Sequence, residues 1–171
     1  MKAVEHRLPR VRVGRRYRFS AAHRLHTDLL PPERNREVFG KCNNPFGHGH
    51  DYVMEVILEG EMDPATGRLV PLEMLDLFVK RVWLDQVNRR NLNLDLPEFA
   101  ALVPTTENLA VVAARRLNAA WPQWFAGRSA RIEKLRIWET PRNIFEVFVP
   151  AKDGQEAEPH EAVIESRHQG S

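Results

Sequence analysis

Hydrophobic and polar residues alternate along two segments of the chain. The apolar members of this alternation are Val11, Val13, Tyr17 and Phe19 in the first segment and Tyr52, Met54, Val56 and Leu58 in the second. A period of two is typical of strands that bury one face. We therefore expect strands over residues 11–23 and 48–59 that pair antiparallel, and two further strands over 132–138 and 145–149.

A turn is predicted after the second strand by the segment Asp63-Pro64-Ala65-Thr66-Gly67. Proline fixes φ early in a turn, and glycine tolerates a positive φ late in it. Residues 68–71 are expected to return antiparallel and complete a hairpin. A second turn, at residues 140–143, joins the last two predicted strands.

Helical spacing of apolar residues occurs in two places. The positions are Leu72, Leu75, Phe78, Val79 and Val82 in the first and Leu109, Val112, Ala113, Leu117 and Ala120 in the second. Repeats of three and four residues predict helices with one buried face. Thr105 or Thr106 is expected to cap the second helix, and Glu107 adds a negative charge to its first turn.

Together these elements predict an α+β fold in which two helices cover one face of an antiparallel sheet. The segment between the first two strands and residues 88–104 are expected to be loops. In this prediction residues 11–150 form one domain. Residues 1–10 and 151–171 are mostly polar and are expected to be tails.

The composition narrows the class of protein. The chain has 171 residues, of which 43% are hydrophobic and 28% charged, and this excludes disorder over the whole length. A single cysteine excludes a disulfide scaffold. The net charge of +2, without a dominant basic run, gives no reason to expect nucleic acid. No stretch has the length of a membrane span and the N-terminus lacks a secretory signal, so we expect a cytoplasmic protein.

Three histidines are the strongest candidates for metal ligands. His48 and His50 are two residues apart, so in a strand their side chains project from the same face. His23 ends the first predicted strand, and antiparallel pairing with the second would bring it to the other two. Three neutral imidazoles with one open position are typical of a catalytic zinc site, and nothing here suggests a redox metal. The alternative is a chance His-x-His pair on an exposed strand.

Cys42 lies in a polar, turn-rich loop, whereas a structural cysteine normally lies in an apolar run. The neighbouring Lys41 and a nearby metal would each lower the pKa of its thiol. We expect a general base or nucleophile, with a fourth zinc ligand and a bystander thiol as alternatives. Arg34, Arg36 and Lys41 in the same loop are candidates for anion binding, although exposed bases usually bind nothing specific.

Five separated segments resemble the 6-pyruvoyl-tetrahydropterin synthase family and occur in the family's order. They are FSAAHRL at 19–25, GKCNNP with GHGH at 40–50, GEMDPATG at 60–67, PTTEN at 104–108 and WET at 138–140. The resemblance implies the tunnelling fold, a four-stranded antiparallel sheet with two helices on one face. It further implies trimers whose sheets form a barrel, stacked as hexamers, with active sites between subunits. The implied metal is zinc, and the implied substrate is 7,8-dihydroneopterin triphosphate.

By position, the resemblance also implies the roles of individual residues. The zinc ligands would be His23, His48 and His50, and the catalytic cysteine would be Cys42. The substrate-binding residues would be Thr105, Thr106, Glu107 and Glu139, with Glu139 anchoring the pterin ring. A carboxylate can accept two adjacent N–H donors of such a ring. Zinc would acidify the C–H protons of the substrate side chain, and a thiolate would accept one of them.

One motif of the family, an Asp-His pair just before Asn-Leu, is missing from this chain. Aligned without a gap, Asn88-Arg89 replaces the pair, and aligned with an insertion, Asp85-Gln86 does. Neither alignment supplies a histidine, so we expect the proton relay to be absent or rebuilt.

Other residues are candidates to act in place of the missing pair. His26, His160 and His168 could supply an imidazole. Arg89 or Arg90 could instead bind the triphosphate through bidentate hydrogen bonds.

Three functions follow from this resemblance. The first is a zinc-dependent carbon–oxygen lyase that forms 6-pyruvoyl-tetrahydropterin with elimination of triphosphate. The five residues between Cys42 and His48 favour it. The second is the 6-carboxytetrahydropterin synthase of the queuosine pathway, a carbon–carbon lyase, whose bacterial members typically have three residues there. The third is a pterin-binding relative with lost or altered turnover. A zinc hydrolase on an unrelated substrate is a more remote alternative, because one scaffold can host unlike chemistries.

Overall fold

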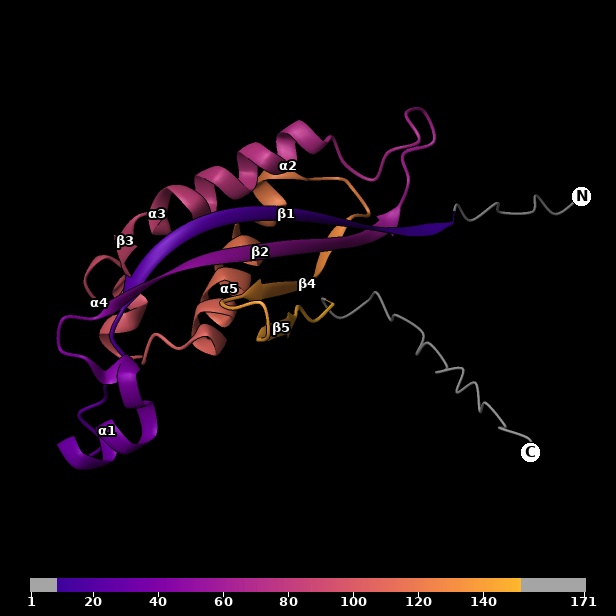
Figure 1. The fold of residues 1–171 in the computed structure, drawn as a ribbon. Helices are drawn as coiled ribbons and strands as arrows, with labels where there is room; N and C mark the ends of the chain where they lie inside the picture. The colour runs from indigo at the N-terminus through magenta and orange to yellow at the C-terminus, as the bar shows by residue number, and fades with distance from the viewer. Residues whose placement is uncertain (1–8, 152–171) are drawn as a thin grey trace, which may run out of the picture.

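The computed structural model describes residues 9–151, so the expected tails at 1–10 and 151–171 lie almost wholly outside the described residues. A five-stranded sheet forms the centre of the molecule, in the order β3-β1-β2-β4-β5 (Figure 1). The strands are β1 (Arg10–His23), β2 (His48–Glu61), β3 (Arg90–Asn91), β4 (Arg131–Trp138) and β5 (Ile144–Phe148). The first strand therefore includes Arg10, which was assigned to the tail.

The four longer strands run antiparallel, as the alternation predicts. β1 and β2 pair over their whole length, from Arg10 opposite Glu61 to His23 opposite His48. The expectation of a four-stranded, fully antiparallel sheet is nevertheless wrong, because β3 adds a fifth strand that pairs parallel with Ala21 and Ala22 of β1. A strand of two residues is too short to produce an alternating pattern in the sequence.

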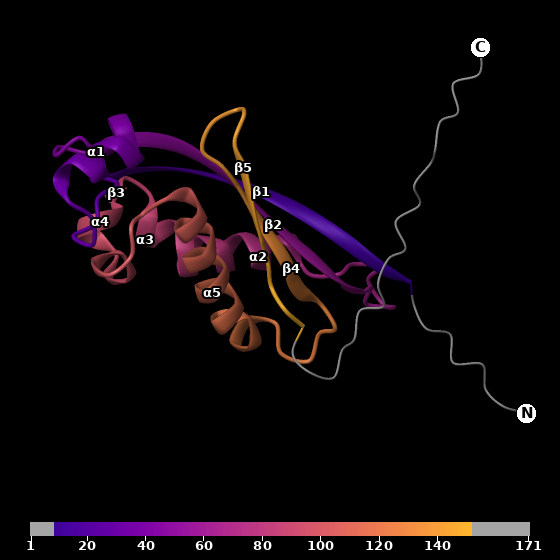
Figure 2. The same cartoon turned by 90° about the horizontal axis from the view of Figure 1, so that it is seen from below.

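Two helical segments cover the same face of the sheet (Figure 2). The first is α2 (Leu72–Val79), which continues through one π-helical turn, η2 (Lys80–Leu84), into α3 (Asp85–Val87). The second is α5 (Thr106–Trp124). Thr105 is its N-cap, since its hydroxyl oxygen accepts the N–H of Asn108 at 3.3 Å. Both predicted helices and one of the two predicted caps are confirmed.

The two segments expected to be loops contain further short elements. α1 (Pro32–Phe39) and the 3-10 helix η1 (Gly40–Asn43) lie between β1 and β2, beyond the ends of these strands (Figure 1). β3, α4 (Leu92–Asp95) and η3 (Pro97–Ala100) lie between α3 and α5. Prolines begin α1 and η3, where a missing N–H costs nothing.

The predicted turn after β2 forms, and the N–H of Gly67 donates to the carbonyl of Asp63 at 2.8 Å. The strand expected at residues 68–71 does not form. Leu69 and Val70 are only 5% and 2% exposed, and they belong to the hydrophobic core. Burial of this short apolar run, and not pairing with β2, explains its composition.

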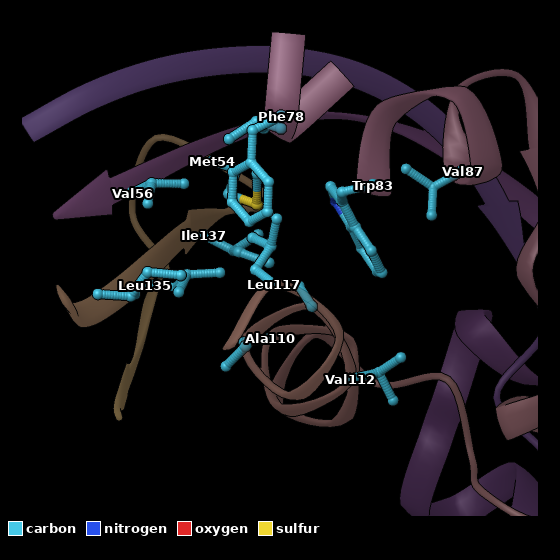
Figure 3. Packing of buried hydrophobic residues seen from close by; sticks show 14 of the residues in the cluster. Met54, Val56, Phe78, Trp83, Val87, Ala110, Val112, Leu117, Leu135 and Ile137 are labelled. Atoms are coloured by element: carbon cyan, nitrogen blue, oxygen red, sulfur yellow. The ribbon is translucent and has the colours of Figure 1, made fainter. Parts of the chain in front are cut away.

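The core lies between the sheet and the helices (Figure 3). Met54 of β2 and Ile137 of β4 pack toward Phe78, Trp83 and Leu117, and all five side chains are fully buried. Such a core holds the strand ends and the N-terminus of α5 in fixed relative positions.

Two tryptophans near the end of α5, Trp121 and Trp124, both pack against the ring of Phe78. None of the helices described between residues 9 and 151 is long and apolar enough to cross a membrane.

Candidate active site

The register of β1 and β2 brings three histidines together. His23 ends β1 opposite His48, and His50 lies opposite Ala21, two residues further along β2. The imidazole centroids are 4.6 to 5.2 Å apart, and one ligand nitrogen from each ring lies within 4.8 Å of the others. The predicted convergence of His23, His48 and His50 is therefore present in the fold.

The orientation of His23 is fixed from outside the cluster. Its Nδ1 lies 2.7 Å from the carbonyl oxygen of Pro104, which can only accept, so Nδ1 carries the proton. The Nε2 atom is then an acceptor, and it lies 3.0 Å from Nε2 of His48. A histidine held in this way by a backbone carbonyl is the usual environment of a metal ligand.

Two further ring nitrogens of the cluster are buried without a partner. They are Nδ1 of His48 and Nε2 of His50. Burial lowers the pKa values of His23 and His48, and the neighbouring imidazoles lower them further, so the neutral form is favoured. Neutral imidazoles with unpaired nitrogens fit a metal cation, which would satisfy several of them at once.

A carboxylate adjoins the histidine cluster. Glu139 follows the end of β4, and its Oε1 lies 3.8 Å from Nε2 of His50. The hydroxyl of Thr106, at the start of α5, donates to the same oxygen at 2.7 Å. Thr106 is only 3% exposed, so this contact orients the carboxylate in a largely dry environment. The site thus places an oriented hydrogen-bond acceptor, the carboxylate of Glu139, beside the histidine cluster.

Tyr52 belongs to this site but was not among the predicted residues. Its side chain is 1% exposed, and its hydroxyl is buried without a hydrogen-bond partner. Burial raises its pKa, and the charge of Glu139 raises it further. The position follows from strand periodicity, because Tyr52 is two residues beyond His50 on the same face of β2. That periodicity is the signal that could have found it.

Cys42 lies in η1 and is half-buried. Its carbonyl accepts the N–H of Leu25 at 2.8 Å, so the loop after β1 holds the cysteine close to the end of that strand. Burial raises the pKa of the thiol, and the charge of Glu139 raises it further. The prediction that Lys41 lowers this pKa is therefore wrong, because burial and the nearby carboxylate determine its direction.

The remaining predicted substrate residues are placed differently from Thr106. The hydroxyl of Thr105 is used in capping α5. Glu107 is exposed in the first turn of that helix, where its negative charge stabilises the helix by interacting with the positive end of the helix dipole.

The segment that replaces the Asp-His pair contacts the edge of β1. Asn88 accepts the N–H of Ser20 through its Oδ1 at 3.0 Å, and the N–H of Arg89 donates to the carbonyl of Ser20 at 2.6 Å. Arg89 has a positive φ of 61°. In the other alignment, Asp85 pairs with Lys80. The contacts of Asn88 and Arg89 join the residues after α3 to β1, whereas the pair of Asp85 with Lys80 lies within the helical segment of η2 and α3.

Of the histidines considered as replacements, His26 contacts Arg24 and Asn43 through its Nδ1, at 3.3 and 3.1 Å. His160 and His168 lie outside the described residues.

Comparison with known proteins gives one family and a set of relatives. Residues 12–149 match the family model described as 6-pyruvoyl tetrahydropterin synthase. The chain is 41% identical over 132 residues to 6-pyruvoyl tetrahydrobiopterin synthase of Homo sapiens, covering 77% of this chain and 87% of that protein. The structure of Caenorhabditis elegans 6-pyruvoyl tetrahydropterin synthase superposes with a TM-score of 0.76 at 42% identity, covering 84% of this chain and 99% of that chain.

A more distant relative has a different name. It is 6-carboxy-5,6,7,8-tetrahydropterin synthase of Rickettsia felis, with 25% identity over 155 residues, covering 80% of this chain and 99% of that protein. The similarity of sequence therefore extends to both kinds of synthase.

Proposed function

The chain belongs to the 6-pyruvoyl tetrahydropterin synthase family, and from this membership we propose that it is a zinc-dependent lyase. The proposed reaction converts 7,8-dihydroneopterin triphosphate to 6-pyruvoyl-tetrahydropterin with elimination of triphosphate. The proposal rests mainly on one observation, which is that the three-histidine cluster lies beside the Thr106–Glu139 pair. The distance between Nε2 of His50 and Oε1 of Glu139 is 3.8 Å.

His23, His48 and His50 would hold the zinc ion, each through one ring nitrogen. When bound, the ion would act as a Lewis acid that acidifies the adjacent C–H groups of the substrate side chain. The carbonyl of Pro104 keeps the imidazole of His23 in the tautomer that a ligand needs.

Glu139 would bind the pterin ring. Its carboxylate can accept two adjacent ring N–H donors in bidentate fashion. The hydroxyl of Thr106 fixes the carboxylate before substrate arrives, which reduces the entropy lost on binding. The fully buried ring of Tyr52 lies beside the histidine cluster, with its centroid 5.7 Å from that of His50.

Cys42 would take a proton from the substrate side chain as general base in its thiolate form, which the charge of a nearby bound zinc ion would favour. The backbone hydrogen bond from Leu25 holds its loop near the end of β1, where His23 lies. Asn88 does not titrate, and Arg89 keeps its proton at working pH. Neither residue would therefore relay protons, and the thiol would exchange its proton with water or substrate.

The active unit would be a homo-oligomer, a trimer of sheets that pairs into a hexamer. Two strand edges support this proposal. β5 is the last strand of the sheet, and β1 pairs with β3 only at Ala21 and Ala22. Free edges of this kind are removed when a sheet closes into a barrel.

Product analysis by mass spectrometry tests the proposed reaction, with zinc-loaded protein and 7,8-dihydroneopterin triphosphate as substrate. We expect release of triphosphate together with a 6-pyruvoyl product. A 6-carboxy product would show the carbon–carbon cleavage named for the Rickettsia relative. Intact substrate, with zinc confirmed in the protein, would leave a pterin-binding relative without turnover. A Cys42→Ala variant that retains zinc is the matched control, and it should lose nearly all product formation.

A further inference from the structure

The chain has two tyrosines, and their hydroxyl groups differ in what they contact. The hydroxyl of Tyr17 on β1 donates to Oδ1 of Asp76 at 3.0 Å. The hydroxyl of Tyr52 on β2 is fully buried, and it has no hydrogen-bond partner within residues 9–151. A buried donor without a partner is costly and rare in proteins, so the hydroxyl of Tyr52 calls for an explanation.

The ring of Tyr52 is held in place by other aromatic rings. Phe19 lies directly opposite on β1, and the two rings stack with their centroids 5.1 Å apart and their planes 18° from parallel. Trp83 packs edge to face against Phe19, with centroids 6.2 Å apart. Because the phenolic oxygen lies on the axis of a closely packed ring, the core of the protein sets its position.

The register of β2 and β4 brings Tyr52 to the carboxylate of Glu139. Pairing of these strands ends with Val53 opposite Trp138, so the next positions on the same two strands are Tyr52 and Glu139. Directly opposite residues point to the same face of a sheet, with Cβ atoms about 4.5–5.5 Å apart. Burial raises the pKa of Tyr52 and the charge of Glu139 raises it further, whereas the nearby hydroxyl of Thr106 opposes this rise. Both members of the Thr106–Glu139 pair therefore lie beside the buried phenol.

The three groups have complementary hydrogen-bonding capacity. A protonated phenol can donate, a threonine hydroxyl can accept and donate at once, and an ionised carboxylate can only accept. Thr106 already donates to Oε1 of Glu139 at 2.7 Å, which leaves lone pairs on its own oxygen. A hydrogen bond from Tyr52 would satisfy the buried phenol and strengthen the bond from Thr106 to the carboxylate.

We propose that Tyr52 is a positioning residue for Glu139, and that its hydroxyl donates to the Thr106–Glu139 pair. This hydrogen bond holds the carboxylate with its remaining lone pairs toward the ring that it binds. The assignment rests on the proposed function, in which Glu139 accepts the ring N–H groups of the substrate. Tyr52 acts through the carboxylate, because its own hydroxyl is too deeply buried to touch a substrate.

Binding of 7,8-dihydroneopterin to the zinc-loaded protein tests the assignment, because it reports on ring binding and needs no turnover. Calorimetric titration gives Kd for the parent protein, Tyr52→Phe, Glu139→Gln and the double variant. We expect Tyr52→Phe to weaken binding about three- to tenfold, which corresponds to one hydrogen bond. In the Glu139→Gln background the same substitution should have no further effect, because the two residues act as one unit. Tyr17→Phe also removes one hydroxyl and is the matched control, which should bind as the parent does.

Two further measurements separate this role from a purely structural one. Weaker ring binding affects the ground state and the transition state equally, so KM of Tyr52→Phe should rise by the same factor and kcat should stay unchanged. Zinc affinity, measured by competition with a chelator, should equal that of the parent, because Tyr52 is not a member of the ligand cluster.

Three results would overturn the assignment. They are parent-like binding of 7,8-dihydroneopterin by Tyr52→Phe, a further loss of affinity when this substitution is added to Glu139→Gln, and a fall in zinc affinity. The last result would show that Tyr52 acts on His50, whose ring centroid is 5.7 Å away. Parent-like binding by Glu139→Gln would contradict the proposed ring-binding role of Glu139 and this inference with it. A loss of binding in Glu139→Gln but not in Tyr52→Phe would contradict this inference alone.

Discussion

At the scale of single residues, the site depends on contacts between parts of the chain that are far apart in sequence. His23 and Pro104 are separated by 81 positions, and the carbonyl of Pro104 sets the tautomer of His23. Thr106 and Glu139 come from the start of a helix and the end of a strand. His23 and Glu139 are therefore each oriented by a group from a distant part of the chain, and this limits their motion before any ligand binds.

Zinc affinity should depend on the three histidines of the cluster and not on histidines elsewhere in the chain. His48→Ala removes one of three imidazoles and leaves too few protein ligands for a tetrahedral site with one open position. We expect zinc affinity, measured by competition with a chromophoric chelator, to fall by more than about 100-fold. His26→Ala is the matched control, because His26 lies outside the cluster, and it should keep the parent affinity. Equal affinity in all three proteins would show that zinc binds elsewhere.

At the scale of elements, the loop between η1 and β2 sets the position of the second strand relative to the first. Gly47 has a positive φ of 70°, and a Cβ atom built on it would lie 2.9 Å from the carbonyl oxygen of His23. Gly40 also has a positive φ, of 51°, but a Cβ atom there would meet nothing within 4 Å. The two glycines therefore differ in one respect, which is the contact with His23.

This difference gives a matched pair of substitutions. Gly47→Ala and Gly40→Ala should each lose about 1–2 kcal/mol of unfolding free energy from the left-handed backbone conformation. Gly47→Ala should lose more, and it should also weaken zinc binding, because the backbone of His23 has to move. Urea denaturation and chelator competition measure the two effects. Parent-like zinc affinity in Gly47→Ala would contradict the role of this close contact in shaping the cluster.

The elements that could be predicted from the sequence are those in which apolar residues recur at a regular spacing over many positions. Fourteen residues of β1 and nineteen of α5 repeat their buried positions often enough to be recognised. The histidine cluster was predictable for the same reason, because the alternation fixes both the face of His48 and His50 and the pairing with His23. α1 had a usable signal in Pro32 followed by Glu33 in its first turn.

Features that depend on tertiary contacts could not be predicted in this way. β3 has two residues, and it pairs with β1 next to the contacts of Asn88 and Arg89 with Ser20. The run Leu69-Val70 was taken for a strand, yet it fills the core. The pKa of Cys42 depends on burial and on Glu139, which is 97 positions away in the chain, and not on its neighbour Lys41.

At the scale of the whole molecule, the sheet has one covered face and one charged face. The helices cover the first, whereas the second carries cross-strand ion pairs such as Arg16 with Glu55 at 2.9 Å and Arg136 with Glu146 at 2.8 Å. The outer strand β5 exposes Ile144 and Phe148, which are 54% and 67% accessible. Within residues 9–151 nothing pairs with the outer edge of β5, and apolar side chains beside such an edge are suited to pairing with another copy of the sheet.

Disruption of that edge should dissociate the proposed oligomer. The parent protein is expected to sediment at three or six times the chain mass of 19.8 kDa. Ile144→Asp combined with Phe148→Asp places charges on the β5 edge, which would pair with the β1 edge of the next copy in a ring, and should yield a smaller species. Activity should also be lost if sites lie between subunits. Leu77→Asp is the control, because Leu77 is 46% exposed on α2, away from the strand edges. A parent protein that sediments as a monomer and is fully active would show that one chain supplies the whole site, and that its free edges serve no assembly.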